Sequence, residues 1–104
     1  MPIKFITNND TTELYAAKVA FLDVFATWCG PCKAVAPIVE ELAEEFDGRV
    51  EFFKSDSDEN PDLSKKLRVM SIPNMVLLKE GKVVSRQIGF QEADVLRAWI
   101  EENL

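Results

Sequence analysis

Apolar residues along this chain fall into runs of two kinds, which predict strands and helices in alternation. The run from Val19 to Ala26 contains a single polar residue, Asp23, and such a run is typical of a strand covered on both faces, as in the middle of a parallel sheet. Residues 34–46 place apolar side chains at helical spacing and glutamates on the other side, which predicts an amphipathic helix. Asp47-Gly48 is expected to end it.

Shorter segments continue this alternation. Residues 8–12 supply N-cap candidates for a short helix over residues 13–17. Residues 50–56 predict a second strand. Asn60-Pro61 is expected to open another short helix, because proline is well tolerated in the first helical turn.

A hairpin and a helix follow. Residues 75–78 and 82–88 predict two strands joined through Glu80-Gly81, a pair typical of a turn. A last helix, over residues 91–103, is expected to bury four side chains: Val95, Leu96, Trp99 and Ile100. This order of elements predicts a mixed sheet with helices on both faces, and a length of 104 residues predicts one domain over residues 1–104.

Composition narrows the functions open to such a domain. Hydrophobic residues make up 47% and charged residues 29% of the chain, as in globular proteins. The 12 lysines and arginines against 18 aspartates and glutamates give a net charge of −6, which argues against binding to nucleic acid or to an anionic membrane. The chain has no histidine, so mechanisms that need a Ser-His or Cys-His pair are excluded. Its four glycines form no phosphate-binding loop.

The sequence also predicts where the protein works. No apolar run approaches the ~18 residues of a membrane span, and the start of the chain lacks the apolar stretch of a signal peptide. Two cysteines are too few for a secreted disulfide scaffold. We therefore expect a soluble cytoplasmic protein, and a monomer.

The candidate chemistry lies in Trp28-Cys29-Gly30-Pro31-Cys32-Lys33, between the buried strand and the amphipathic helix. Cys29 and Cys32 are the only cysteines and stand three residues apart, so on a first helical turn they face the same way and can be bridged. Pro31 falls where a helix has no use for an amide hydrogen, and Gly30 removes steric cover from the pair.

Position in the helix predicts different roles for the two thiols. Cys29 would lie at the exposed helix start, where unpaired N–H groups and the helix dipole favour a thiolate. A thiolate there is the nucleophile toward a disulfide. Cys32, one turn further in, would be better shielded and suited to the resolving role.

Two other interpretations of this pair are open. A zinc site would need two further ligands, and with no other cysteine and no histidine only carboxylates could serve. An inert structural disulfide would close a very small loop and stabilise the fold little. The pattern favours redox chemistry, and we expect no metal and no cofactor.

Several residues together carry a resemblance to a known family. They are the hexapeptide 28–33, Asp23 six residues before the first cysteine, Ile72-Pro73 ahead of an apolar strand, and Pro37, Lys54, Gly81 and Gly89. With these residues the chain resembles thioredoxins over nearly its full length. The resemblance implies an α/β fold with a central five-stranded mixed β-sheet flanked by four α-helices, and a general protein-disulfide reductase that works by reversible dithiol–disulfide exchange.

The resemblance also implies partners. They are disulfide-containing client proteins and a thioredoxin reductase, an NADPH-driven flavoprotein, that restores the dithiol. An oxidase or isomerase of the same fold, working outside the cytosol, is an alternative that the Gly-Pro dipeptide and the absent signal peptide argue against. A binding module with dispensable cysteines is a further alternative.

Asp23 and Lys54 are the candidate groups for proton transfer. An ionised carboxylate in an apolar strand is energetically expensive, although an Asp at a strand end can also reach solvent. In thioredoxins the residue that matches Asp23 lies beneath the second cysteine and helps to move its proton. The resemblance places Lys54 close to Asp23, where it would tune that proton, whereas by composition alone Lys54 would be a solvated edge residue.

The resemblance also implies a substrate groove. It makes the Ile72-Pro73 bond cis, with the backbone before the proline paired to an extended substrate. The residues expected to contact substrate are Trp28, Gly30, Pro31, Ile72, Pro73, Ile88 and Gly89. Three residues depart from common thioredoxin residues: Phe25 replaces Trp, Ser71 replaces Gly and Asn74 replaces Thr. Ser71 and Asn74 border the groove, so partner preference is the property that they affect.

Overall fold

The computed structural model describes residues 2–104, and its centre is a five-stranded mixed sheet. The strands are β1 (Ile3–Phe5), β2 (Val19–Phe25), β3 (Glu51–Asp56), β4 (Asn74–Lys79) and β5 (Lys82–Ile88). They lie in the order β1-β3-β2-β4-β5. β1, β3 and β2 run parallel, whereas β4 is antiparallel to β2 and β5 is antiparallel to β4. The predicted mixed sheet is confirmed.

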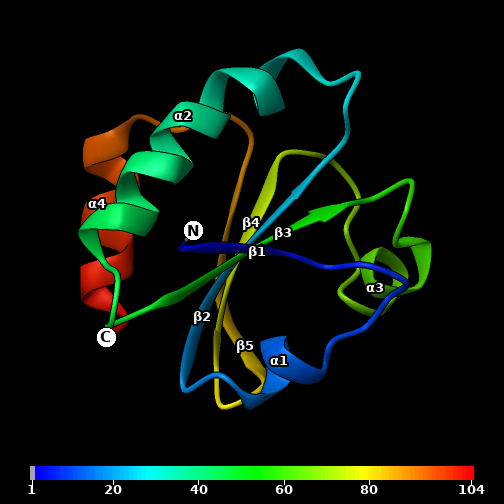
Figure 1. Ribbon diagram of the computed structural model, residues 1–104. Helices are drawn as coiled ribbons and strands as arrows, with labels where there is room; N and C mark the ends of the chain where they lie inside the picture. The colour runs from blue at the N-terminus through cyan, green and yellow to red at the C-terminus, as the bar shows by residue number, and fades with distance from the viewer. Residues whose placement is uncertain (1) are drawn as a thin grey trace.

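Four helices cover the two faces of this sheet (Figure 1). They are α1 (Thr12–Ala16), α2 (Gly30–Glu45), α3 (Pro61–Lys66) and α4 (Ala93–Glu102). Figure 1 shows α2 and α4 on one side of the sheet and α1 and α3 on the other. Among the helices of residues 2–104, none combines the length and the apolar character that a membrane crossing requires.

Strand β2 separates two hydrophobic cores. Phe21 packs under α2 and α4, stacked on Phe52 with ring centroids 4.6 Å apart and edge-on to Trp99. Leu22 points the other way, into the core that α1 and α3 cover. Successive strand residues face opposite sides of a sheet, so Asp23 shares the α2 side with Phe21. The expectation of a central strand buried on both faces is confirmed.

Two elements differ from the sequence-based expectation. Val95 was expected to be buried, but its side chain is 45% exposed. Adjacent helical residues point about 100° apart, and α4 turns Leu96, Trp99 and Ile100 to the core instead. The three-residue edge strand β1 is absent from the residue pattern, because three residues are too few to show a period of two and Phe5 faces solvent.

Two asparagines join the loop after β1 to the start of α3. Asn60 precedes α3 as expected, but its side chain does not cap that helix. Its Nδ2 donates to the carbonyl oxygens of Ile6 at 3.0 Å and Asp56 at 3.2 Å, and its Oδ1 accepts from the amide of Asn9 at 2.8 Å. In return, Asn9 Oδ1 accepts from the amide of Leu63 in the first turn of α3 at 3.1 Å. The side chain of Asn9, an expected cap of α1, therefore caps α3.

We expect Asn60→Ala to destabilise the protein by about 2 kcal/mol, because it leaves the Ile6 carbonyl and the Asn9 amide without the partner that the Asn60 side chain supplies. Urea unfolding of the oxidised protein measures this difference. Glu59→Ala changes an exposed neighbour and is the matched control. Equal unfolding midpoints for the two variants would contradict the structural role of Asn60.

Candidate active site at the Cys29–Cys32 disulfide

The two cysteines meet where β2 gives way to α2. Cys29 has an extended backbone and is the N-cap of α2, and Pro31 lies in the first turn, as expected. A disulfide joins Cys29 to Cys32, with 5.2 Å between their Cα atoms. Cys29 Sγ also accepts a hydrogen bond from the amide of Cys32 at 3.2 Å. The sulfur of Cys29 therefore receives a helix N–H donor, an arrangement that stabilises a thiolate once the disulfide is reduced.

Exposure does not distinguish the two sulfurs as strongly as the sequence suggests. Cys29 is 6% exposed and Cys32 is 4% exposed in the disulfide form. The expected exposure of Cys29 is thus wrong for this form, because Ala26 and Ile72 pack against the pair. The surface beside Gly30 is open, as expected. What separates the two cysteines is position, one at the helix N-cap and one inside the first turn.

The loop before β4 lies against the disulfide. The Ile72-Pro73 bond is cis, and the carbonyl oxygen of Ile72 lies 3.9 Å from Cys29 Sγ. The carbonyl of Pro73 accepts from the amide of Gly89 at 2.8 Å. Since Asn74 pairs with Ile88 across β4 and β5, Ile88 and Gly89 lie beside this loop. Of the expected substrate contacts, Pro73 itself is buried, whereas Gly30, Pro31 and Ile88 face solvent.

Asp23 and Lys54 form a pair inside the sheet. They are register partners on the parallel strands β2 and β3. Asp23 is fully buried, and its Oδ2 lies 3.7 Å from Lys54 Nζ, a distance that gives an ion pair without a hydrogen bond. Neither carboxylate oxygen has a hydrogen-bond partner within residues 2–104. Lys54 also lies over the ring of Phe25, 4.8 Å from its centroid. The structure therefore excludes an Asp23 that reaches solvent at a strand end and a Lys54 that is solvated at the edge of the sheet.

Burial dominates the electrostatics of Asp23. Loss of hydration raises the pKa of its carboxyl from 3.8 to about 6, and the positive charge of Lys54 opposes that rise. A carboxyl that titrates close to neutral pH can accept and return a proton under cellular conditions. Burial therefore gives Asp23 a pKa that suits proton transfer.

Comparisons with known proteins agree with this geometry. The family model described as Thioredoxin matches residues 3–102. The chain is 41% identical to the thioredoxin of Staphylococcus saprophyticus, 40% to that of Staphylococcus haemolyticus and 39% to that of Staphylococcus aureus strain Mu50. Each alignment covers 104 residues and all of both chains. The chain belongs to the thioredoxin family.

Family membership settles the reaction class. The protein is a thiol–disulfide oxidoreductase that reduces protein disulfides by dithiol–disulfide exchange, and the Cys29–Cys32 pair is the redox-active disulfide. Thioredoxins act on disulfide-containing client proteins and interact with a reductase. The interpretations as a zinc site or an inert disulfide give way to this one. Within residues 2–104, no group of three or more His, Cys, Asp or Glu side chains is placed to hold a metal ion.

The sequence analysis missed Asp58, which lies beside this thioredoxin site. Trp28 is 69% exposed, and its indole Nε1 donates to Asp58 Oδ2 at 2.9 Å. Asp58 sits in the turn after β3, where its own amide donates to Asp56 Oδ1 at 2.9 Å. Asp58 thereby holds the exposed indole of Trp28 in one orientation. An exposed indole N–H can also bond to water, so the sequence does not indicate this acceptor, and only the fold identifies the residue 30 positions away that supplies it.

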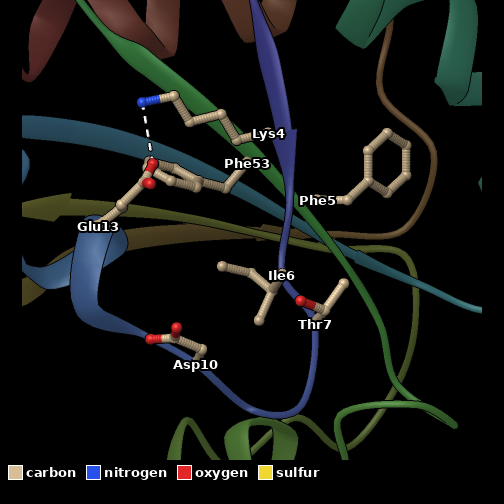
Figure 2. Close-up of a pocket in the computed structure, with 7 residues that line it drawn as sticks. All are labelled: Lys4, Phe5, Ile6, Thr7, Asp10, Glu13 and Phe53. Atoms are coloured by element: carbon tan, nitrogen blue, oxygen red, sulfur yellow. Dashed lines mark ion pairs between the residues drawn. The ribbon is translucent and has the colours of Figure 1, made fainter.

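A hollow beside β1 and α1 is separate from this chemistry. Figure 2 shows the residues that line it, among them Lys4 and Glu13, whose Nζ and Oε2 lie 3.0 Å apart in an ion pair. Its volume is about 380 Å³. None of the expected site residues lines it, so the site is the disulfide and its surroundings.

The buried acid predicts a pH-dependent stability. A raised carboxyl pKa means that the folded protein holds its proton longer than the unfolded chain. Stability therefore falls as pH rises from 3.8 to about 6 and is level above that. Asp23→Asn removes this dependence, so its stability relative to the parent should increase across that window by about 3 kcal/mol. Urea unfolding of both oxidised proteins between pH 3 and pH 8, at intervals of about one unit, measures it.

Two further variants test the assignment. Asp47→Asn removes an exposed carboxylate and should leave the pH profile of the parent intact. Lys54→Met removes the charge that opposes the raised pKa of Asp23, so the falling limb should extend to higher pH. Parallel pH profiles for Asp23→Asn and the parent would show that Asp23 carries no raised pKa.

Proposed function

We propose that this thioredoxin-family chain is a general cytoplasmic disulfide reductase, one domain over residues 1–104 that acts as a monomer. Its disulfide is returned to the dithiol by a thioredoxin reductase, an NADPH-driven flavoprotein. The observation that carries the proposal is the position of Cys29 at the N-cap of α2, with its sulfur receiving an amide N–H and lying 3.9 Å from the Ile72 carbonyl. A pair that must be held as a dithiol works in a reducing compartment.

In the proposed cycle, Cys29 is the nucleophile and Cys32 resolves. The Cys29 thiolate attacks one sulfur of a client disulfide, which forms a mixed disulfide and releases the other client sulfur as a thiolate. The Cys32 thiolate then attacks Cys29 Sγ, forms the Cys29–Cys32 disulfide and releases the first client sulfur. The client gains two electrons and two protons, and the protein loses the same. The oxidised form of this cycle contains the disulfide described above.

Asp23 is the proposed proton acceptor for Cys32. It lies on the α2 side of β2, and α2 carries Cys32 in its first turn. Because burial raises the pKa of Asp23 to about 6, its carboxylate is mostly ionised at neutral pH and can take a proton from a thiol. Lys54 tunes this group from 3.7 Å away. Lys54 is a positioning residue in this proposal, since it acts through Asp23.

Clients are proposed to bind along the loop beside the disulfide. An extended client segment would pair with the backbone at Ile72, ahead of the buried Pro73. Around it lie exposed apolar groups, Trp28 and Ile88. Gly89 adds little bulk there, and Gly30 and Pro31 leave the approach to Cys29 open. This surface recognises backbone and apolar contacts rather than one client sequence, which suits a general reductase.

Coupled turnover tests the function. The protein is mixed with a bacterial NADPH-dependent thioredoxin reductase, NADPH and a disulfide-bonded protein, and NADPH oxidation is followed at pH 7. We expect oxidation that depends on both the protein and the client. A variant with both cysteines replaced by serine is the control and should give the background rate. If that variant supported the same rate, or the parent supported none, the proposed reductase would be wrong.

The roles of the two cysteines predict different trapping behaviour. Cys32→Ser should accumulate mixed disulfides with client proteins, because Cys29 still attacks but nothing resolves the product. Cys29→Ser should accumulate few, since the remaining thiol lies inside the first turn of α2 rather than at its N-cap, where the sulfur receives an amide N–H. Non-reducing gels of both reduced variants after mixing with one oxidised client compare them. Equal trapping would reverse or abolish the assignment.

A further inference from the structure

The loop that reaches the disulfide begins at an unusual helix end. After α3, the amide of Arg68 donates to the carbonyl of Lys65 at 3.1 Å and the amide of Val69 donates to that of Ser64 at 2.9 Å. This pair of backbone hydrogen bonds ends a helix at one residue in the left-handed conformation. Here that residue is Arg68, with φ of 55°. The pattern leaves the carbonyl of Leu67 available to another donor.

Arg86 on β5 donates to that carbonyl and also to a side chain at the far end of the same loop. Its Nη2 donates to Leu67 O at 2.9 Å, and its Nη1 donates to Asn74 Oδ1 at 3.4 Å. Asn74 is 1% exposed, and its Nδ2 donates to the carbonyl of Ser71 at 3.3 Å. Arg86 and Asn74, which we call the Arg86 brace, thus tie both ends of the segment 68–73 to the sheet.

The middle of the tied segment is open to solvent. Met70 is 91% exposed, the highest value among the large apolar side chains of residues 2–104. Two residues later, the Ile72 carbonyl lies 3.9 Å from Cys29 Sγ. The segment therefore has anchored ends and an open middle beside the reacting sulfur.

We propose that Arg86 and Asn74 are positioning residues that hold the segment 68–73 in the conformation that binds the peptide backbone of a client. The proposal rests on the proposed docking of clients along Ile72. If the segment were loose, binding a client would have to order it, and that ordering would reduce the rate of productive encounter. A fixed segment presents Ile72 and Met70 without this loss.

The chemistry of the brace supports a dedicated role. A guanidinium carries donors in a planar fork and can serve two acceptors at once, which an ammonium does less well. Among the ion pairs of residues 2–104, none involves Arg86, so its donors are directed to neutral oxygens. Asn74 must accept from Arg86 and donate to Ser71 at the same time, and an amide does both. The Thr common at this position has a single shorter hydroxyl.

The brace predicts a selective loss of activity toward peptides. A client with a peptide backbone needs the positioned segment, whereas a small disulfide without one needs only an accessible Cys29. We expect Arg86→Met to lower the rate constant for a disulfide-bonded peptide by about fivefold and to leave that for bis(hydroxyethyl) disulfide unchanged. Arg86→Lys keeps the charge and one donor position, so it should recover part of the peptide rate.

The experiment uses the full chain in a single turnover. Each protein is reduced, freed of reductant and mixed with either disulfide at pH 7, and formation of the Cys29–Cys32 disulfide is followed. Lys82→Met removes the same charge from an exposed position on the same strand and should match the parent with both substrates. Urea unfolding checks that every variant is folded under the assay conditions.

Asn74→Thr provides a second, independent route to the same result. It should lower the peptide rate selectively, and the double variant with Arg86→Met should lose little more, because both changes break one brace. Equal peptide rates for Arg86→Met and Lys82→Met would overturn the brace. So would a parallel loss with both substrates, which would indicate general damage to the site. A parent that reduces neither disulfide would overturn the proposed function itself.

Discussion

Burial of β2 on both faces is the constraint on which the site depends. A strand covered by helices on each side can reach the surface only at its ends, and β2 ends at Phe25, four residues before Cys29. The topology then brings three other segments to the same edge of the sheet. β3 runs parallel to β2 and ends beside it, with Phe25 paired to Asp56. β4 runs antiparallel and starts there, with Val24 paired to Asn74.

This convergence explains why residues distant in sequence surround one disulfide. The turn after β3 delivers Asp58 to Trp28, and the loop before β4 delivers Ile72 to Cys29. β5 ends at the same edge because it is antiparallel to β4, so Ile88 and Gly89 arrive beside Pro73. A mixed sheet in this strand order places one end of each of four strands, β2, β3, β4 and β5, around the N-terminus of α2. The reactive pair is therefore positioned by backbone pairing between the strands.

Asp23 shows a conflict between stability and chemistry in the same strand. A buried carboxylate without a hydrogen-bond partner destabilises the fold at neutral pH. Lys54 offsets part of this from the neighbouring strand, at a distance too long for a hydrogen bond. A tighter pair would stabilise the ionised form and pull the pKa of Asp23 back toward its ordinary value. The loose pair keeps that pKa near 6, so stability is lower than an apolar residue would give.

The residue pattern predicted what depends on local order and missed what depends on distant contacts. A continuous apolar run identified β2, helical spacing identified α2, and Glu80-Gly81 between two apolar segments identified the hairpin. The hexapeptide with its resemblance identified the disulfide. β1 escaped because it is three residues long, and Val95 because helical spacing alone does not say which edge of an apolar stripe faces the core. Asp58, Arg86 and the exchange between Asn9 and Asn60 escaped for another reason. Each acts through a hydrogen bond between residues far apart in the chain.

Substitutions are expected to act differently on groups held by backbone pairing and on groups held by side-chain hydrogen bonds. The groups that perform the exchange are held by strand pairing and a helix start, so altering them disturbs the fold or the reaction itself. The groups around them are held by single side-chain hydrogen bonds from other strands, as Asn74 and Arg86 hold the loop at Ser71 and Leu67. Substitution at those supports can shift the loop without disturbing the sheet. Asn74 and Ser71, where this chain departs from common thioredoxin residues, belong to this group held by side-chain hydrogen bonds. We therefore expect substitutions at these two positions to affect the loop beside the disulfide rather than the exchange chemistry.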